Sequence, residues 1–449
     1  MFQLFGAFTM RYYVISLAIF TLLINQVSAN DKGETAETTK QFKTLVMESA
    51  PYLPKSLDEQ FISCPINTTK GNIKPNYRSA TDVNYQQAGW EKRITADWNF
   101  FQIPAEQGRV LAIDFSQQTR NNQPTLAFKY LANNQTQHQL YEPWSSSKVM
   151  AITATMSQLN KKGISATSRI GETPLADLTT SIHSYLPFGK TAAESNDIAT
   201  FMVNTVGRTY VTSLFHENWL NLANPSVRLQ GAYGITPFKP TSLVWSEIGS
   251  KKSTILPLYQ NSADDPAYQG YRCDTCGLTG NKPMTTLAEA EWLKRLASHE
   301  REPLTQHPYL TDNSIKELFY ATSHTDTQHK VGGMIQGISK MLTHAIAKSL
   351  SSNQDLQLIG TELGKNILDE ATSGKWRIFQ KIGWGYSETR SAGETVVLAH
   401  VCLPHFQGGR EFTIAAQVSV PGDKESLVND AGVKMQKLLD KAVAGVLAL

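Results

Sequence analysis

The sequence predicts an α+β fold, in which one antiparallel sheet is built from both ends of the chain and an all-α lobe is inserted between them. Two strand-like runs come early, VLAIDF at 110–115 and LAFKYL at 126–131. Helical patterns fill the middle of the chain, and three further strand-like runs followed by an amphipathic helix close it. Because the strands lie at both ends, they must meet in space to form a single sheet.

The first two predicted strands are separated by the polar stretch QQTRNNQ, which is typical of a turn. A helix is predicted after them, and it opens at the serine-rich stretch EPWSSSKVM of residues 142–150. Its apolar residues recur at helical spacing, at Val149, Met150, Ile152, Met156 and Leu159.

Residues 190–360 are predicted to be mostly helical, and a Pro- and Gly-rich interval at about 224–285 interrupts them as an insertion or a long surface loop. The helical patterns occupy 195–207, 208–220, 286–299, 312–324 and 333–350. The closing strands are predicted at 376–385, 394–403 and 410–420, and the last helix at 427–449.

The N-terminus has the pattern of a secretory signal peptide. Residues 1–29 carry one positive charge, Arg11, then an apolar run at 14–24, and they end in Val27-Ser28-Ala29, a small-x-small cleavage pattern. This run is shorter than the roughly 20 residues that span a bilayer, although an uncleaved anchor is the alternative. We therefore expect a periplasmic or secreted protein with no stable membrane span after cleavage.

Beyond the signal peptide we expect two parts. Residues 30–100 are predicted to form an N-terminal helix and an irregular extension, and residues 101–449 one main domain whose helical lobe spans about 145–370. The net charge is only +3 and no block of Lys and Arg occurs, which excludes a nucleic-acid partner. The phosphate-binding glycine motifs are also absent from the sequence, so no cofactor is expected.

Four cysteines, Cys64, Cys273, Cys276 and Cys402, leave three interpretations open. In an oxidising compartment they can form disulfides, for which three connectivities exist. The Cys273-x-x-Cys276 spacing is also half of a zinc knuckle, but a tetrahedral site needs four ligands and no second pair exists, so we predict no metal site. Free thiols are the third possibility.

The serine-rich stretch poses the question of a nucleophile. A serine hydroxyl needs a neighbouring base to take its proton, and residues three apart share a helix face. Only Ser145 stands three residues before Lys148; Ser146 and Ser147 do not. Ser145 is therefore the candidate nucleophile and Lys148 its partner, against the plainer interpretation of a polar helix start.

Two further motifs follow in order. Ser195-Asn196-Asp197 opens a predicted helix, where a second hydroxyl can relay a proton. Lys381-Ile382-Gly383 lies in a predicted strand, where the lysine adds positive charge and the glycine lets a substrate backbone approach. The N–H of Trp384 can then complete an oxyanion hole with that of Ser145. Helix capping by serine and a solvated lysine are the plainer alternatives.

In this order, SxxK, a Ser-x-Asn-like element and Lys-x-Gly on a strand resemble the serine β-lactamase and penicillin-binding-protein superfamily, nearest the class A β-lactamases. The resemblance covers about residues 105–449 and implies a β-lactamase/transpeptidase-like fold. By this resemblance Ser145 is acylated, Lys148 acts as base or proton relay, Ser195 passes a proton to the leaving nitrogen, and Lys381 holds the local field.

The sequence departs from the family pattern in the substrate-binding elements. Asp197 stands where the family has asparagine, and an ionised carboxylate cannot donate to a substrate carbonyl, so it would pair with Lys148 or serve as a base. Ile382 stands where the family has a hydroxyl that contacts a substrate carboxylate. Arg390 is the candidate replacement, and Gly383 and Trp384 complete the expected substrate-binding residues.

The third departure from the family pattern concerns the base that activates water for deacylation. Glu217-x-x-Leu220-Asn221 matches the family element whose glutamate activates water, but it falls inside the predicted helix at 208–220. The stretch SVRLQGAYGITPF at 226–238 is the better candidate for the loop beneath the site, and it has no carboxylate. Glu217 is therefore either this base or a solvated helix residue. Without it, an acyl-enzyme would persist.

Three functions remain to be weighed. The first is an exported serine hydrolase of class A β-lactamase type that cleaves an amide, with a β-lactam ahead of a peptidoglycan-derived peptide as substrate. The second is a D,D-peptidase or transpeptidase-like protein with a long-lived adduct. The third is a non-catalytic relative that binds cell-wall fragments or a protein partner, which Asp197 and Ile382 favour.

Overall fold

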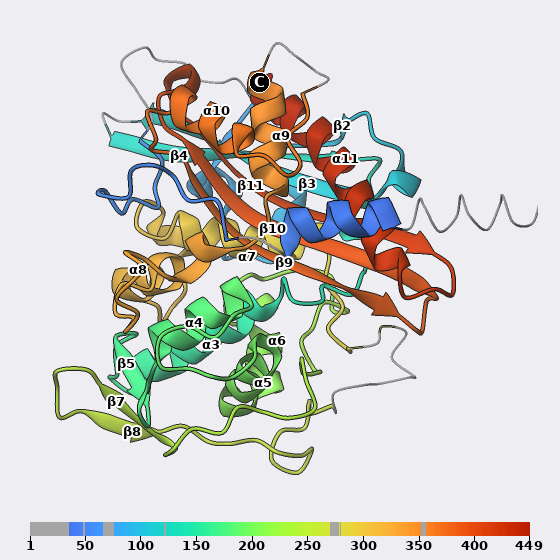
Figure 1. Ribbon diagram of the computed structural model, residues 1–449. Coiled ribbons are helices and arrows are strands. Elements are labelled where there is room, and N and C mark those ends of the chain that lie inside the picture. The colour runs from blue at the N-terminus through green and yellow to red at the C-terminus, as the bar shows by residue number, and fades with distance from the viewer. Residues whose placement is uncertain are drawn as a thin grey trace, which may run out of the picture.

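The computed structural model describes residues 36–47, 50–65, 76–120, 123–269, 278, 280–351 and 356–449 (Figure 1). The expected signal peptide and the Cys273-x-x-Cys276 motif lie outside these residues. In the described ranges, no helix is both long enough and apolar enough to cross a membrane.

One antiparallel sheet joins the two ends of the chain, as the sequence predicts. The early strands β3 (Arg109–Arg120) and β4 (Gln123–Asn133) form a hairpin, and β9 (Arg377–Ser387), β10 (Ala392–Leu403) and β11 (Arg410–Pro421) form a meander. Strand β11 pairs with β3, with Phe412 opposite Asp114, so the order is β1-β4-β3-β11-β10-β9. This arrangement confirms the predicted α+β fold class.

Helices cover both faces of this sheet because its strands are apolar on both sides. Strand β10 is buried along its whole length. Its residues Val397 and Ala399 face a core shared with α9 (Met341–Leu350) and α11 (Leu427–Leu447), and α10 (Leu363–Ala371) packs on α9. Its residues Val396 and Leu398 face the opposite core, where α7 (Thr286–Ala297) packs on the sheet.

The helical lobe lies beyond α7, on the side of the sheet away from α11 (Figure 1). It comprises α3 (Lys148–Lys161), α4 (Leu175–Ser184), α5 (Ser195–Val206), α6 (Arg208–Phe215) and α8 (Asp312–Tyr320). A small second sheet, in the order β6-β5-β7-β8, closes its far end. Its strands are β5 (Ser168–Ile170), β6 (Thr173–Pro174), β7 (Val244–Glu247) and β8 (Ser253–Ile255), so the interval at about 224–285 contributes two strands as well as loops.

Short elements complete the chain. They are β1 (Arg78–Ser79), α2 (Ala80–Val83), β2 (Ala96–Phe101) and the 3-10 turns η1 (Trp90–Lys92), η2 (Ala105–Gln107), η3 (Thr136–His138), η4 (Pro303–Thr305), η5 (Gly333–Gln336) and η6 (Phe406–Gly408). Strand β1 pairs with β4 antiparallel and β2 pairs with β4 in parallel, so this part of the chain belongs to the main sheet, and the β2–β4 pair departs from its antiparallel pattern.

The helix predicted at 208–220 is wrong in its second half, because α6 ends at Phe215. The following carbonyl groups are bound by side chains from elsewhere in the fold. The Trp90 indole donates to Leu220 O at 2.7 Å, and Arg295 donates to Trp219 O at 2.8 Å. The backbone also leaves the helical register, since Leu220 N donates to Leu214 O at 2.9 Å and Leu222 N to Phe215 O at 3.0 Å.

The helix predicted at 333–350 also begins later, at Met341. Gln380 of β9 donates to Gly337 O at 3.2 Å and to Ser339 O at 2.6 Å, which ties this segment to the strand. A β-carbon on Gly337 would lie 2.6 Å from Gln380 O, so the approach of the two backbones requires glycine.

The N-terminal segment is fixed to the main domain. A helix at 36–46 places Phe42 against Gly432 of α11 and, edge-on, against Trp384 at 6.0 Å between ring centroids. Cys64 forms a disulfide with Cys402 of β10. This pair settles one of the connectivities left open by the sequence.

Candidate active site

The turn that precedes α3 presents one serine and buries the other two. Ser146 donates its hydroxyl proton to Pro143 O at 2.6 Å and also contacts the Glu289 carboxyl. The Ser147 hydroxyl lies 3.0 Å from that of Tyr233. Ser145 is half-buried and faces a pocket. Of the three serines, Ser145 is the one among the residues that line the pocket.

Ser145 lies just outside the helix and not in its first turn. Helix α3 begins at Lys148, whose N–H donates to Ser145 O at 3.2 Å. Trp144, the residue before Ser145, has a φ of 51°, in the left-handed region, and the chain therefore bends sharply at this point. The hydroxyl of Ser145 is thereby held next to the positive end of the helix.

Strand β9 lies directly against this turn. A β-carbon on Gly383 would be 2.5 Å from Ser145 N and 2.9 Å from Ser146 N, so only glycine fits there. Lys381 is two residues earlier and points to the same face. The SxxK turn and the Lys-x-Gly strand, more than 200 residues apart in the chain, are therefore in contact.

The open edge of β9 offers a backbone N–H to the pocket. Strand β9 is the last in the sheet, with β10 as its neighbour on one side. The carbonyl of Ile382 accepts a hydrogen bond from Tyr185, which shows that this residue's polar groups point away from β10. The N–H of Trp384, two residues on, points the same way. It faces the pocket that Ser145 lines.

Lys148 is fully buried and joins the first two motifs. Its amine donates to Ser195 Oγ at 2.9 Å and to Asn196 Oδ1 at 2.6 Å. Burial, and next the charge of Lys282, hold the pKa of Lys148 well below its ordinary value. A lysine in this state favours the uncharged amine, which can accept a proton.

The third motif meets the second at one carbonyl. Ser195 Oγ donates to Ile182 O at 3.1 Å, and Lys381 Nζ donates to the same oxygen at 2.5 Å. Lys381 is also fully buried, and burial followed by the charge of Lys148 lowers its pKa well below the usual range. Ser195 thus lies between the two lysines.

Asn196, and not Asp197, occupies the place of the third motif residue. Asn196 lines the pocket and accepts from Lys148, whereas Asp197 is not among the described residues that line it. The Asp197 backbone carbonyl accepts from Phe238 N at 2.9 Å, and its carboxylate lies beside Gly234. Successive residues of a helix point about 100° apart, so one position decides which side chain reaches the amine.

Tyr185 is a site residue that the sequence analysis missed. It follows α4 with a φ of 58° and donates its phenol proton to Ile382 O. Burial raises the pKa of this phenol, and the neighbouring Ser145 hydroxyl lowers it by a smaller amount. The ring packs at a tilt of 38° against Trp384, 4.8 Å between centroids, and its centroid lies 3.2 Å from Lys381 Nζ. Tyr185 belongs to none of the three motifs, so no sequence signal marked it.

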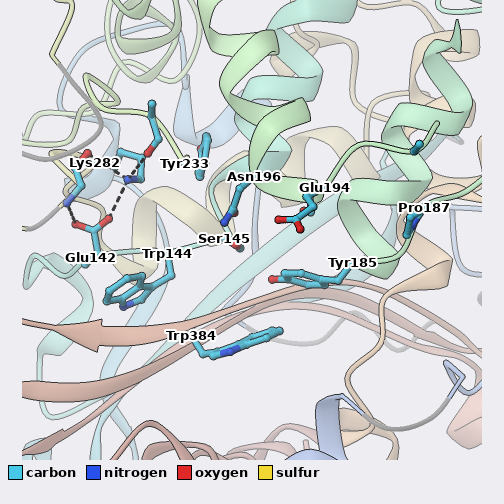
Figure 2. Close-up of a pocket in the computed structure, with 14 residues that line it drawn as sticks. Glu142, Trp144, Ser145, Tyr185, Pro187, Glu194, Asn196, Tyr233, Lys282 and Trp384 are labelled. Atoms are coloured by element: carbon cyan, nitrogen blue, oxygen red, sulfur yellow. Dashed lines mark hydrogen bonds and ion pairs between the residues drawn. The ribbon is translucent and has the colours of Figure 1, made fainter. Parts of the chain in front are cut away.

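These groups border a cavity of about 540 Å³ (Figure 2). Its lining residues are Glu142, Trp144, Ser145, Tyr185, Pro187, Ala192, Glu194, Ser195, Asn196, Ala232, Tyr233, Gly280, Lys282 and Trp384. Aromatic rings form its base, and Ser145 lies near its centre in Figure 2. The volume is that of a small-molecule or peptide site.

A buried ion pair forms the wall of the cavity on the side of Trp144 (Figure 2). Lys282 Nζ lies 3.2 Å from Glu142 Oε1 and donates to Ala232 O at 2.9 Å. Gly280 N donates to the second oxygen of Glu142 at 3.0 Å. Both oxygens of Glu142 therefore have a partner. Neither Glu142 nor Lys282 was identified as a site residue from the sequence.

Two expected site residues lie elsewhere. Glu217 is exposed in the turn after α6 and is outside the set of described residues that line the cavity, so the structure does not bring it to Ser145. Arg390 pairs with Glu394 through two contacts, at 2.6 and 3.1 Å. Trp144 donates to the same carboxylate at 2.9 Å, so the charge of Arg390 is already balanced beside the cavity.

Solved structures similar in fold are β-lactamases and PBP-A. A mutant of the chromosome-encoded β-lactamase of Vibrio parahaemolyticus is 12% identical, with 75% of this chain and 93% of that one covered at a TM-score of 0.34. A class A β-lactamase of Bacteroides cellulosilyticus DSM 14838 is 11% identical, covering 75% and 93% at 0.36. PBP-A is 11% identical, covering 74% and 91% at 0.31.

No protein-family model and no curated protein sequence matches the chain. Identities of 11–12% bear on fold and not on activity, and TM-scores below 0.5 describe only a loose superposition. The chemistry of this chain therefore has to be argued from its own site.

Proposed function

We propose that this protein is an acyl-serine enzyme, in which Ser145 attacks an amide carbonyl and becomes acylated. The observation that carries the proposal is the buried Lys148 amine, which bonds both Ser195 and Asn196 three residues after a serine that faces a cavity. A buried amine in its uncharged form, three residues after a serine, is a base that can activate that serine when substrate binds.

In the proposed reaction Lys148 takes the Ser145 proton as the oxygen attacks. The negative charge that develops on the carbonyl oxygen is stabilised by the N–H groups of Ser145 and Trp384. Ser195, hydrogen-bonded to Lys148, then carries the proton to the leaving nitrogen, which breaks the C–N bond. Lys381 stabilises this proton path through its shared carbonyl with Ser195.

The positions of the carboxylates favour slow hydrolysis of the acyl-enzyme, as in the transpeptidase-like alternative, over the rapid hydrolysis of a β-lactamase. Deacylation by water needs a base within reach of the ester. Glu217 is exposed beyond α6, and Glu142 is held by Lys282 and Gly280. Glu194 lines the cavity but is exposed to solvent. We therefore infer a long-lived adduct, with a β-lactam or a peptidoglycan-derived peptide as acyl donor.

Recognition of a substrate carboxylate must differ from the family pattern. Ile382 is buried in the core beneath α11, so its side chain cannot meet a ligand. A buried Ile382 would suit a non-catalytic relative, whereas the hydrogen bond of the buried Lys148 amine to Ser195, three residues after Ser145, argues for chemistry. The Cys64–Cys402 disulfide supports a location in the periplasm or outside the cell.

The test is covalent labelling of the mature protein and of a Ser145→Ala variant. Each is incubated with a fluorescent penicillin and a chromogenic cephalosporin, and intact mass is followed over time. We expect a Ser145-dependent adduct that persists and little colour. Rapid turnover would restore the β-lactamase alternative, and equal labelling of Ser145→Ala would overturn the assignment of the nucleophile.

A further inference from the structure

A second cavity lies on the other side of the segment that walls the active site. Ala232 lines both cavities, Tyr233 lines the first and Gly234 the second. Thr200 of α5 holds this partition, because its hydroxyl accepts from Tyr233 N at 3.1 Å and from Gly234 N at 3.0 Å. The second cavity has a volume of about 560 Å³, which lies in the range of ligand sites.

The walls of the second cavity are mainly apolar. Phe201 and Phe238 meet edge to face at 5.5 Å between centroids, and Leu258 is half-buried beside them. At the rim, Ile235 is 83% exposed and Leu243 is 43% exposed. Large exposed apolar side chains around a cavity mark a surface that a ligand would cover.

One buried cation in this wall, Arg208, has an N–H group that is not hydrogen-bonded to any described residue. The Arg208 side chain is fully buried, its Nε donates to Gln230 O at 3.2 Å and its guanidinium stacks 4.1 Å from the Tyr268 ring centroid. Its Nη1, and the Oδ1 of Asn204 near the end of α5, have no hydrogen-bond partner within the part of the chain that the structure describes. Asp265 hydrogen-bonds the backbone N–H groups at the start of α6; burial lowers the pKa of Arg208, and the charge of Asp265 partly offsets this.

The charge of the lining is therefore one-sided. Arg208 and the exposed Lys239 are both cationic, and the described residues that line the cavity include no carboxylate. A buried guanidinium with an unsatisfied N–H group is costly, and a carboxylate is a good partner for it because a guanidinium can donate two N–H groups to two oxygens. The cavity thus offers apolar walls and one anion-binding end.

We propose that this second cavity binds an amphipathic monoanion, a carboxylate on an apolar chain or ring, with the carboxylate at Arg208 and the apolar body between Phe201, Phe238 and Leu258. The site is separate from the acyl-serine chemistry, since only Ala232 is shared. It therefore stands whether or not Ser145 is a nucleophile.

The test uses decanoate and the matched neutral decanol, each below its aggregation limit, in calorimetric titrations of the full mature protein. We expect one decanoate per chain and at least tenfold weaker binding of decanol. Arg208→Met should abolish this preference for the acid, and Lys239→Glu, at the exposed rim, should weaken decanoate about threefold or more.

Substitutions at the rim of the cavity test the proposal even if the Arg208→Met variant does not fold. Leu243→Trp at the rim should weaken both ligands, whereas Ile255→Trp, equally a surface substitution on β8 but outside the lining, should leave both unchanged. Equal affinity for acid and alcohol, absence of saturable binding, or decanoate binding unaffected by Leu243→Trp and Lys239→Glu would each overturn the proposal.

Discussion

Gly383 of β9 faces the amide nitrogen of Ser145 so closely that a β-carbon would lie 2.5 Å from it. The contact sets the distance between the two N–H groups proposed to hold the oxyanion. Substituting Gly383→Ala must move the strand or the turn, and a shift of about 1 Å can cost on the order of 100-fold in rate.

We therefore expect Gly383→Ala to reduce the rate of acylation by about 100-fold while the protein remains folded. Stopped-flow labelling with the fluorescent penicillin measures the rate, and circular dichroism the fold. Gly445→Ala on α11, where the added carbon meets the rings of Phe100 and Phe101 at 3.3–3.4 Å, tight contacts that a small ring shift relieves, is the control. A normal rate in Gly383→Ala would remove this contact from the mechanism.

Lys148→Met should abolish acylation and stabilise the fold near neutral pH. The pKa of Lys148 in the folded protein lies well below the ordinary 10.5. Between these two values the unfolded chain binds more protons than the folded one, so the free energy of unfolding rises with pH across that interval. The gain from removing the amine should be largest below the folded pKa and should vanish above about pH 10.5.

Urea denaturation of both proteins over a pH series measures this difference. The acylation rate of the parent protein should rise as the pH increases through the pKa of Lys148 in the folded protein, since only the uncharged amine accepts a proton. Acylation by Lys148→Met at the normal rate would exclude this lysine as the base.

Lys282 should set the pH at which the reaction begins, because its charge is the second cause of the lowered pKa of Lys148. The double variant Glu142→Gln/Lys282→Met removes the buried pair together, which leaves no unpaired charge. We expect its acylation profile to shift to higher pH. A profile identical to that of the parent would show that burial alone lowers the pKa of Lys148.

Tyr185→Phe should increase acylation about 3- to 10-fold, the effect of one hydrogen bond. The phenol donates to the Ile382 carbonyl and lies beside the Ser145 hydroxyl, so a substrate that pairs with the β9 edge must displace it. The phenylalanine ring keeps its packing on Trp384. Second-order rate constants measure the gain; a large loss would instead make the phenol part of the proton path.

Reduction of Cys64–Cys402 should lower the free energy of unfolding by about 2–5 kcal/mol, because the bond closes a very long loop. The disulfide is remote from the cavity lining, so acylation at 25 °C should persist. Denaturant titration with and without reductant tests the first expectation. A Cys64→Ser/Cys402→Ser variant separates this bond from the other cysteines.

The sequence by itself determined the sheet and the order of the three motifs. Alternating and continuous apolar runs predict the strands, because a buried strand must be apolar wherever it faces a core. The spacing of Ser145 and Lys148 selected the serine that faces the cavity, since three residues is a local relation that a helix start fixes.

Only the tertiary structure decided which other side chains reach that serine. Asn196, and not Asp197, bonds to Lys148, and Tyr185 contacts the strand of the third motif. Glu142 pairs with Lys282, and Glu217 lies outside the site. These outcomes depend on side-chain direction in turns and on partners up to 197 residues apart, as for Tyr185 and Ile382. Local periodicity carries no information on such contacts, because the free energy that selects them arises from packing between distant segments.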